Sequence, residues 1–258
     1  MAAAAGQWRY QPAANCLAGR TILVTGAGEG IGAALARTCA LAGANVVLLG
    51  RNRGKLESVF DWIGEHTHTS AVIVPCDLEA LREENVSALH DAIAENYGRL
   101  DGLVHNASLL GAMTPIEFYP ANTWEQVLRV NTTAPFLLTR GLLPLLNAGH
   151  PASIIFTSSG VGRAARAFWG AYAVSKYAIE GLTAVLADEL RQTSQIVVTS
   201  LNPGGTRTAM RAKAYPAENP ATLPTPEAHM DLYLYLLANT PRSAHGARLS
   251  ARDWPGPA

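Results

Sequence analysis

The sequence predicts one α/β domain in which helices cover both faces of a doubly wound parallel sheet. Two observations predict this fold class. Short runs rich in Val, Ile and Leu recur along the chain with little alternation of polar residues, which is typical of strands buried on both faces of a parallel sheet. Longer segments with helical periodicity separate these runs, and this alternation favours a sheet covered by helices on both sides.

Each strand is expected to be short and to lead into a helix or a long connection. The apolar runs place strands at 21–24, 45–49, 71–74, 103–105, 153–156 and 196–201. Amphipathic segments place helices at 31–42, 83–96, 124–146 and 172–191. The segment 209–225 carries three prolines and no clear period, so we expect a loop or lid there.

The length of 258 residues fits a single α/β domain. No internal repeat or low-complexity linker divides the chain. We assign the domain to residues 16–250, with the lid near 209–225. A loose N-terminal segment at 1–15 and a C-terminal tail at 251–258 are expected to flank it.

The composition argues against several kinds of partner. Twenty basic residues balance twenty acidic ones, so no net field attracts nucleic acid or an anionic membrane. No apolar run has the length of a signal peptide or a membrane span. Cys16, Cys39 and Cys76 lie far apart, which predicts free thiols in a cytoplasmic protein. His66 and His68 have no evident third ligand, so no metal site is expected.

A glycine-rich sequence, Thr-Gly-Ala-Gly-Glu-Gly-Ile-Gly at 25–32, follows the first expected strand and opens the first helix. Glycines allow a tight turn and a close approach of the backbone to a ligand. The helix N-terminus offers unpaired N–H groups to a pyrophosphate. We therefore expect a Rossmann-type dinucleotide site, and the residues of this loop assigned to it are Gly26, Gly28, Gly30, Ile31 and Gly32.

The end of the second strand indicates which dinucleotide binds. An NAD-binding unit usually carries Asp or Glu about 20 residues after the glycines. This chain has Arg51, Asn52 and Arg53 there. The two arginines are suited to a 2′-phosphate through charge-assisted hydrogen bonds, which predicts NADP and a preference for NADPH over NADH. The alternative is a solvated surface pair that binds nothing.

A second motif suggests acid–base chemistry. Tyr172 and Lys176 are four residues apart, so they share one face of the expected helix. A nearby ammonium lowers the pKa of a phenol, which makes the pair a tuned general acid/base. Ser159 follows the fifth strand, at the sheet edge where α/β proteins bind ligands. Asn131 lies among apolar residues, either as a solvated helix residue or as a buried link in a proton relay.

Together these motifs resemble those of the classical short-chain dehydrogenases/reductases over nearly the whole chain. The resemblance assigns the family's catalytic set to Asn131, Ser159, Tyr172 and Lys176. Its other cofactor-binding positions fall on Asp77, Leu78, Asn106, Ala107, Pro203, Gly204, Thr206 and Thr208.

Two residues depart from the family pattern, and other stretches are typical of one branch. His105 and Ser108 replace the first Asn and the final Gly of the family's NNAG motif. We expect His105 to pack at a strand end rather than to act chemically. The stretches 48–52, 169–172 and 202–211 resemble the YciK-like branch of bacterial oxidoreductases.

The resemblance implies an NADP(H)-dependent oxidoreductase that interconverts a carbonyl and an alcohol by hydride transfer. Ser159 would bind the substrate oxygen and Tyr172 would exchange a proton with it. Lys176 would lower the pKa of Tyr172 and hold the nicotinamide ribose, while Asn131 would order a water that links Lys176 to solvent. The resemblance also implies a homodimer or homotetramer. The alternative function is a cofactor-binding sensor or scaffold with little turnover.

The substrate stays open between an apolar ketone and an anionic keto compound. An apolar wall is expected from Phe168, Trp169, Met210 and Tyr215. Four basic side chains that crowd the same region would suit a carboxylate or phosphate: Arg163, Arg166, Arg207 and Arg211.

Overall fold

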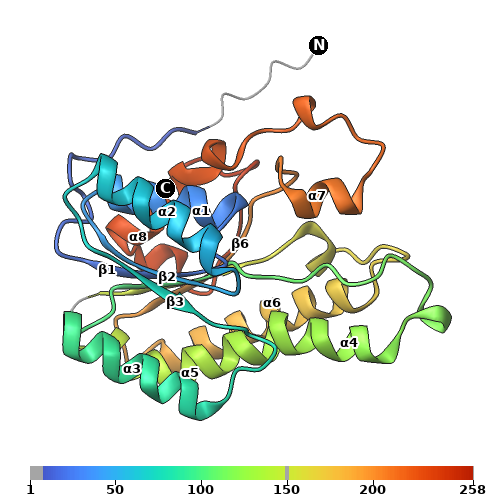
Figure 1. Ribbon diagram of the computed structural model, residues 1–258, viewed down its shortest axis with the longest axis horizontal. Coiled ribbons are helices and arrows are strands. Elements are labelled where there is room, and N and C mark those ends of the chain that lie inside the picture. The colour runs from blue at the N-terminus through green and yellow to red at the C-terminus, as the bar shows by residue number, and fades with distance from the viewer. Residues whose placement is uncertain (1–7, 149–150, 258) are drawn as a thin grey trace.

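The computed structural model of the chain describes residues 8–148 and 151–257, and within them seven parallel strands form one sheet (Figure 1). The strand order is β3-β2-β1-β4-β5-β6-β7. The strands are β1 (Thr21–Thr25), β2 (Asn45–Gly50), β3 (Ala71–Pro75), β4 (Gly102–His105), β5 (Ser153–Thr157), β6 (Val197–Asn202) and β7 (Arg248–Ser250). The doubly wound parallel sheet predicted from the apolar runs is confirmed.

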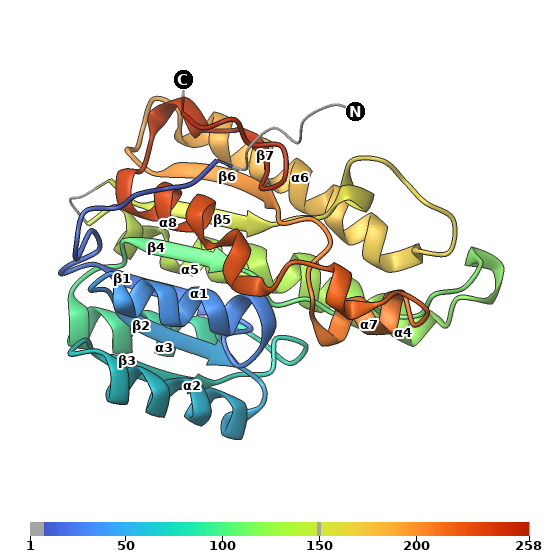
Figure 2. The same ribbon diagram turned by 90° about the horizontal axis from the view of Figure 1, so that it is seen from above.

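Helices cover both faces of the sheet (Figures 1 and 2). One face carries α1 (Gly30–Leu41), α2 (Arg53–His66) and α8 (Met230–Asn239). The other carries α3 (Glu83–Tyr97), α5 (Ala134–Leu146) and α6 (Gly170–Leu190). The helices α4 (Ala121–Leu128) and α7 (Ala209–Ala214) lie beyond the carboxyl ends of the strands (Figure 2).

The central strands explain why the apolar runs are continuous. Every residue of β1 and of β5 is buried, because helices pack on both faces of these strands. The edge strand β3 is only partly buried, and Val72 is 38% exposed. Two apolar cores result, one between the sheet and α1, α2 and α8, the other between the sheet and α3, α5 and α6.

The described residues near both ends of the chain contact the rest of the fold. Residues 248–250 form β7, which pairs with β6 alone at the edge of the sheet. In the part of the expected loose N-terminal segment that the structure describes, Trp8 and Tyr10 pack against Tyr235 of α8. Trp254, in the expected tail, contacts Trp8 with ring centroids 6.4 Å apart. These aromatic contacts bury apolar surface of both ends against α8.

The helix expected at 124–146 is interrupted. It begins earlier, as α4, and a five-residue π-helical stretch, Arg129–Thr133, separates α4 from α5. Such π-bulges occur often at functional sites. The expected lid at 209–225 is also partly helical, since it contains α7 and the short 3-10 helix Pro220–Thr222.

The strand order indicates where a ligand-binding crevice is expected in this fold. The chain crosses from β3 at one edge of the sheet to β4 beside β1, and sheets of this kind bind ligands outside the carboxyl ends of the strands at such a switch point. None of the helices within the described residues has the length and apolarity needed to span a bilayer.

Candidate active site

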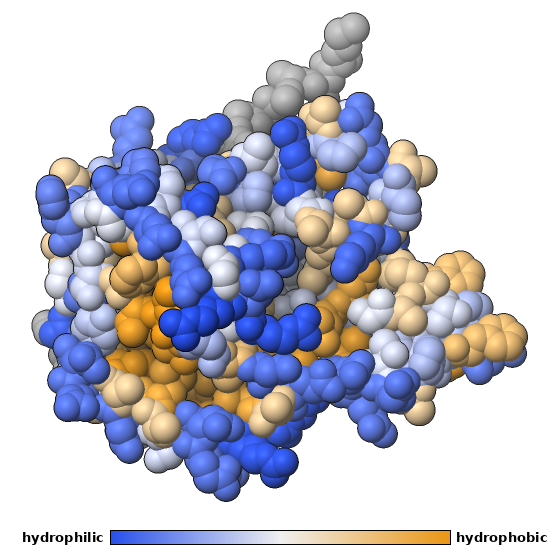
Figure 3. Space-filling model, viewed as in Figure 1, coloured by the Kyte–Doolittle hydropathy of each residue, from blue (hydrophilic) through white to orange (hydrophobic). Residues whose placement is uncertain are grey.

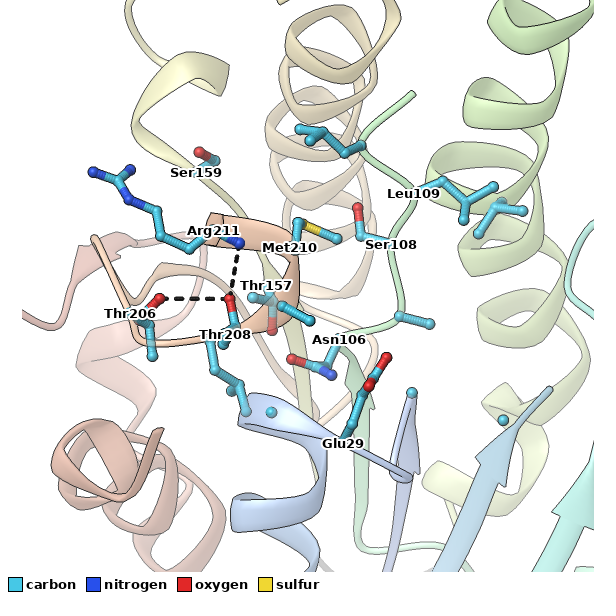
Figure 4. Close-up of a pocket in the computed structure, with 18 of the residues that line it drawn as sticks. Glu29, Asn106, Ser108, Leu109, Thr157, Ser159, Thr206, Thr208, Met210 and Arg211 are labelled. Carbon is cyan, nitrogen blue, oxygen red and sulfur yellow. Dashed lines mark hydrogen bonds between the residues drawn. The ribbon is translucent and has the colours of Figure 1, made fainter. Parts of the chain in front are cut away.

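A cavity of ≈ 470 Å³ lies at the switch point, along the carboxyl ends of the strands. Its walls come from the glycine loop, the ends of β2 and β3, the segment after β4, and the α7 region (Figure 4). The catalytic and cofactor-binding residues assigned from the glycine loop, from Arg51 and Asn52 and from the family resemblance line this cavity, except Gly32 and Asn131. Phe168 and Tyr215, expected in the apolar wall, do not line it. The structure thus brings residues from seven separate segments to one cleft.

The glycine loop has the geometry of a phosphate cradle. Gly26 and Gly30 have φ angles of 68° and 55°, in the left-handed region that favours glycine. A Cβ on Gly26 would lie 3.0 Å from the Cα of Ala107. Gly32 supports the loop from behind, because a Cβ there would lie 2.1 Å from the carbonyl oxygen of Gly26. The loop therefore leaves room for a ligand at the N-terminus of α1.

The far end of the cleft carries basic side chains beside the glycine loop. Arg51 is exposed and lines the cavity. Arg53, expected to share its role, is outside the cavity wall and binds Glu57 with an Nε–Oε1 distance of 2.8 Å. Lys55 takes its place in the lining and forms an ion pair with Glu29 of the glycine loop. The sequence did not predict a role for Lys55, which lies in the first turn of α2 and faces Gly28 of the glycine loop.

The segment after β4 is tied to the end of β1. The backbone N–H groups of Asn106 and Ala107 each donate to Oγ1 of Thr25 at 3.0 Å. The Asn106 side chain also donates to the carbonyl oxygen of Thr25 at 3.2 Å. The first residue of the glycine motif thus fixes the opposite wall of the cleft, a role the sequence did not reveal.

Tyr172, Ser159 and Lys176 meet at the floor of the cleft. The Ser159 side chain acts on the Tyr172 hydroxyl and lowers its pKa, and Lys176 Nζ lies 5.5 Å from the centroid of the Tyr172 ring. Lys176 Nζ donates to the carbonyl oxygen of Thr157 at 2.8 Å. The Tyr172 and Lys176 side chains are both buried, at 8% and 4% exposure.

Burial dominates the protonation of this pair. It raises the pKa of Tyr172, and the hydrogen bond with Ser159 opposes the rise. The sequence had led us to expect that Lys176 lowers this pKa, but loss of hydration is the larger effect in the cleft. Burial also lowers the pKa of Lys176 to about 8, against the attraction of Glu180.

Asn131 lies in the π-helical stretch and is 2% exposed, so it is not a solvated helix residue. Its amide binds the backbone of Leu109 in both directions: Oδ1 accepts from the N–H at 2.7 Å and Nδ2 donates to the carbonyl at 2.9 Å. Nδ2 also donates to Ser175 Oγ at 3.0 Å. Asn131 thereby joins the loop after β4 to α6 just behind the cleft.

A buried carboxylate that the sequence did not predict lies one helical turn beyond Lys176. Glu180 accepts four hydrogen bonds: from Ser158 Oγ at 2.6 Å, Ser200 Oγ at 2.6 Å, Arg163 Nε at 2.8 Å and Arg248 Nε at 2.9 Å. The serines and Arg163 hold the pKa of Glu180 below its usual value, although burial opposes them. Glu180 therefore places a negative charge near Lys176, whose pKa it raises.

The two departures from the family motif have different surroundings. His105 packs at the end of β4, where it stacks on Phe156 and its Nε2 lies 2.9 Å from Thr139 Oγ1. Burial lowers its pKa to about 3, so the ring is neutral at physiological pH. Ser108 lines the cavity, and its hydroxyl has no hydrogen-bond partner among the described residues.

The histidine pair at 66 and 68 does not gather further ligands. Nδ1 of His66 is 2.8 Å from the carbonyl oxygen of Trp62, and the two rings stack. Across residues 8–148 and 151–257, no group of three or more His, Cys, Asp or Glu side chains is placed to hold a metal ion.

Residues 20–219 match the family model of the short chain dehydrogenases, and the chain belongs to this family of oxidoreductases. It is 48% identical to the uncharacterized oxidoreductase YciK of Escherichia coli (strain K12) over 243 residues, which cover 94% of this chain and 96% of YciK. The branch resemblance is thereby confirmed.

Solved structures agree with this assignment. A short chain dehydrogenase from Pseudomonas syringae matches with a TM-score of 0.93 and 48% identity, over 95% of this chain and 100% of the other. A short chain dehydrogenase from Shigella flexneri 2a, solved in complex with NADP, matches with a TM-score of 0.88 and 47% identity, over 93% and 100% of the two chains.

Proposed function

We propose that this protein is an NADP(H)-dependent oxidoreductase that interconverts a carbonyl and an alcohol. The observation that carries the proposal is the meeting of Tyr172, Ser159 and Lys176 on the floor of a cleft that begins at the glycine loop. A proton donor and a phosphate cradle in one cavity suit hydride transfer coupled to proton transfer.

The cleft fits a dinucleotide along its whole length. The glycine loop and the N-terminus of α1 suit the pyrophosphate. Asp77 and Leu78 would lie beside the adenine, and Arg51 would bind the 2′-phosphate, with Asn52 capping α2 beside it. The remaining proposed cofactor contacts are Asn106, Ala107, Pro203, Gly204, Thr206 and Thr208. The relative solved with NADP supports NADP as the ligand.

The bound dinucleotide supplies or accepts the hydride. Ser159 and Tyr172 hold the substrate oxygen by hydrogen bonds, and Tyr172 donates its proton to that oxygen during reduction. Its raised pKa keeps the phenol protonated at neutral pH, which is the form that reduction requires. The ammonium of Lys176 stabilises the phenolate that forms. Resupply of the proton through Lys176 and a water ordered by Asn131 stays a prediction.

The proposal is tested with the variant Tyr172→Phe. We expect NADPH binding to be retained and turnover across a panel of carbonyl compounds to fall by about 100-fold or more, because the proton donor is lost. Tyr177→Phe is the matched control, since Tyr177 lies on the same helix and is 43% exposed. Binding of NADPH by the natural sequence without turnover on any carbonyl would favour the sensor or scaffold function.

A second copy of the chain is the proposed partner. Val174, Tyr177 and Val185 are exposed apolar residues on one face of α6, and Phe136 at the start of α5 is 44% exposed. This surface supports a homodimer or homotetramer, which the mass in solution would reveal. The free thiols of the three cysteines support a cytoplasmic location.

A further inference from the structure

The Tyr172 end of the cleft indicates the class of substrate, and the inference rests on the proposed function. We infer that the substrate is an uncharged, apolar carbonyl compound or alcohol rather than a keto acid or another anion. Three features carry this inference: the apolar walls, the contacts of the neighbouring arginines, and the pairing of Arg211.

The walls beside Tyr172 are apolar. Trp169 packs on Tyr172 with ring centroids 5.7 Å apart, and both belong to a small buried cluster with Val161. Leu110 and Met210 pack against this cluster and line the cavity. Figure 4 shows the Met210 side chain directed across the cavity toward Ser108. Figure 3 shows apolar surface gathered in the hollow between α7 and α4.

Three of the four arginines near the cleft are bound elsewhere and do not line the cavity. Arg163 donates hydrogen bonds to the Glu180 carboxylate and to the carbonyl oxygen of Leu249. Arg166 donates to the Tyr215 hydroxyl at 2.8 Å. Arg207 binds backbone carbonyl groups of the lid, beginning with that of Pro220 at 2.9 Å. None of these guanidinium groups lines the cavity, and of the three only Arg163 is neutralised by a carboxylate, that of Glu180.

Arg211 lines the cavity, but its charge is already compensated. Its Nε and second terminal nitrogen donate to the two carboxylate oxygens of Glu218 at 2.6 and 2.7 Å. The guanidinium also stacks on Tyr215 at 3.7 Å from the ring centroid. Figure 4 shows the guanidinium directed away from Met210 and Ser108. A substrate carboxylate would have to displace an intramolecular, bidentate partner, which gives no net gain in charge pairing.

Apart from Lys176, the other charged groups of the cleft lie away from Tyr172. Glu29, Arg51, Lys55 and Asp77 lie beside the glycine loop or the ends of β2 and β3. Lys176 is buried and donates to the Thr157 carbonyl group. The Lys176 ammonium already donates to a carbonyl group below Tyr172, so an anion beside Trp169 would be desolvated by apolar walls without a cation that lines them, which is unfavourable.

The inference is tested with matched pairs of carbonyl compounds and NADPH. The pairs are ethyl levulinate with levulinate, and ethyl benzoylformate with benzoylformate. We expect kcat/KM of the natural sequence to be about 10-fold or more higher for each ester, the ratio that a modest desolvation difference produces. Equal or faster reduction of the carboxylates would overturn the inference.

Binding to the NADPH complex of Tyr172→Phe separates this inference from the proposed function. Thermal shifts induced by the same four compounds report binding without turnover. Esters that stabilise the complex more than carboxylates support the inference even if the natural sequence reduces neither. A larger shift with the carboxylates, or no shift with any of the compounds, overturns it.

Glu218→Gln tests the pairing of Arg211 directly. Removal of the carboxylate charge frees the guanidinium, so the ratio of carboxylate to ester kcat/KM should rise about 10-fold. The control is Glu227→Gln, because Glu227 is an exposed glutamate of the next segment of the chain. An unchanged ratio in Glu218→Gln would show that Arg211 is not what excludes anions.

Discussion

The Ser158 hydroxyl donates a 2.6 Å hydrogen bond to the buried carboxylate of Glu180. Ser158 stands between Thr157, whose carbonyl group accepts from Lys176, and Ser159, whose side chain lowers the pKa of Tyr172. Glu180 thus fixes the strand end that presents these groups. It also links them to β7 through Arg248, so the last strand of the sheet helps to support the site.

Replacement of Glu180 by Gln should shift the pH dependence of carbonyl reduction. Glu180 raises the pKa of Lys176, which burial lowers to about 8. Loss of the negative charge lowers this pKa further, so Lys176 loses its proton at a lower pH. If the ammonium is required, activity declines above about pH 8 in the natural sequence and from a lower pH in Glu180→Gln. Profiles of kcat/KM against pH measure the shift.

Ser200→Ala is the control for this prediction. It removes one hydrogen bond to Glu180 but keeps the charge. We therefore expect a loss of stability of about 1 kcal/mol with the alkaline limb unchanged. If kcat/KM declines at the same alkaline pH in both variants and in the natural sequence, the protonation of Lys176 does not cause the decline.

Arg51→Asp should reverse the preference between the two dinucleotides. Arg51 is exposed at the cavity wall and forms no ion pair with any residue that the structure describes, so the change acts on the ligand rather than on the fold. A lost charge-assisted bond to the 2′-phosphate weakens NADPH binding by about 10- to 100-fold, while NADH binding changes little. Titration of both dinucleotides measures the effect.

Arg53→Asp provides the comparison, because Arg53 binds Glu57 and stands outside the cavity. It removes a positive charge two residues away and should alter NADPH affinity only a few-fold. Equal losses in the two variants would refute a specific contact of Arg51 with the phosphate.

The sequence could predict the interior of the fold because buried parallel strands leave a continuous apolar signature. It could not predict β7, since an edge strand that pairs on one side buries only Leu249 of its three residues. The helix α2 likewise gives a weak pattern, because it buries only Leu56, Val59 and Ile63 among charged and polar residues. Elements that bury little apolar surface give a weak pattern.

The sequence predicted those parts of the candidate site whose residues lie close together along the chain. The glycine loop and the Tyr172–Lys176 pair lie within single turns or segments, so their spacing alone brings them together. The partners of Glu180 come from positions 158, 163, 200 and 248, and each is an ordinary polar residue in its own segment. Only the assembled sheet shows that they share one carboxylate.

His105 makes the stability of the protein depend on pH. Burial lowers its pKa from 6.5 to about 3, so the unfolded chain binds more protons than the folded one between these values. Stability is therefore lost as the pH falls below 6.5, by about 2 kcal/mol between pH 7 and pH 5 for this group. Denaturant unfolding at the two pH values should show a smaller loss for His105→Asn, by about that amount. The control is His90→Asn, because His90 is a partly exposed histidine of α3. An equal loss in His105→Asn and in the natural sequence would show that His105 is not the group responsible.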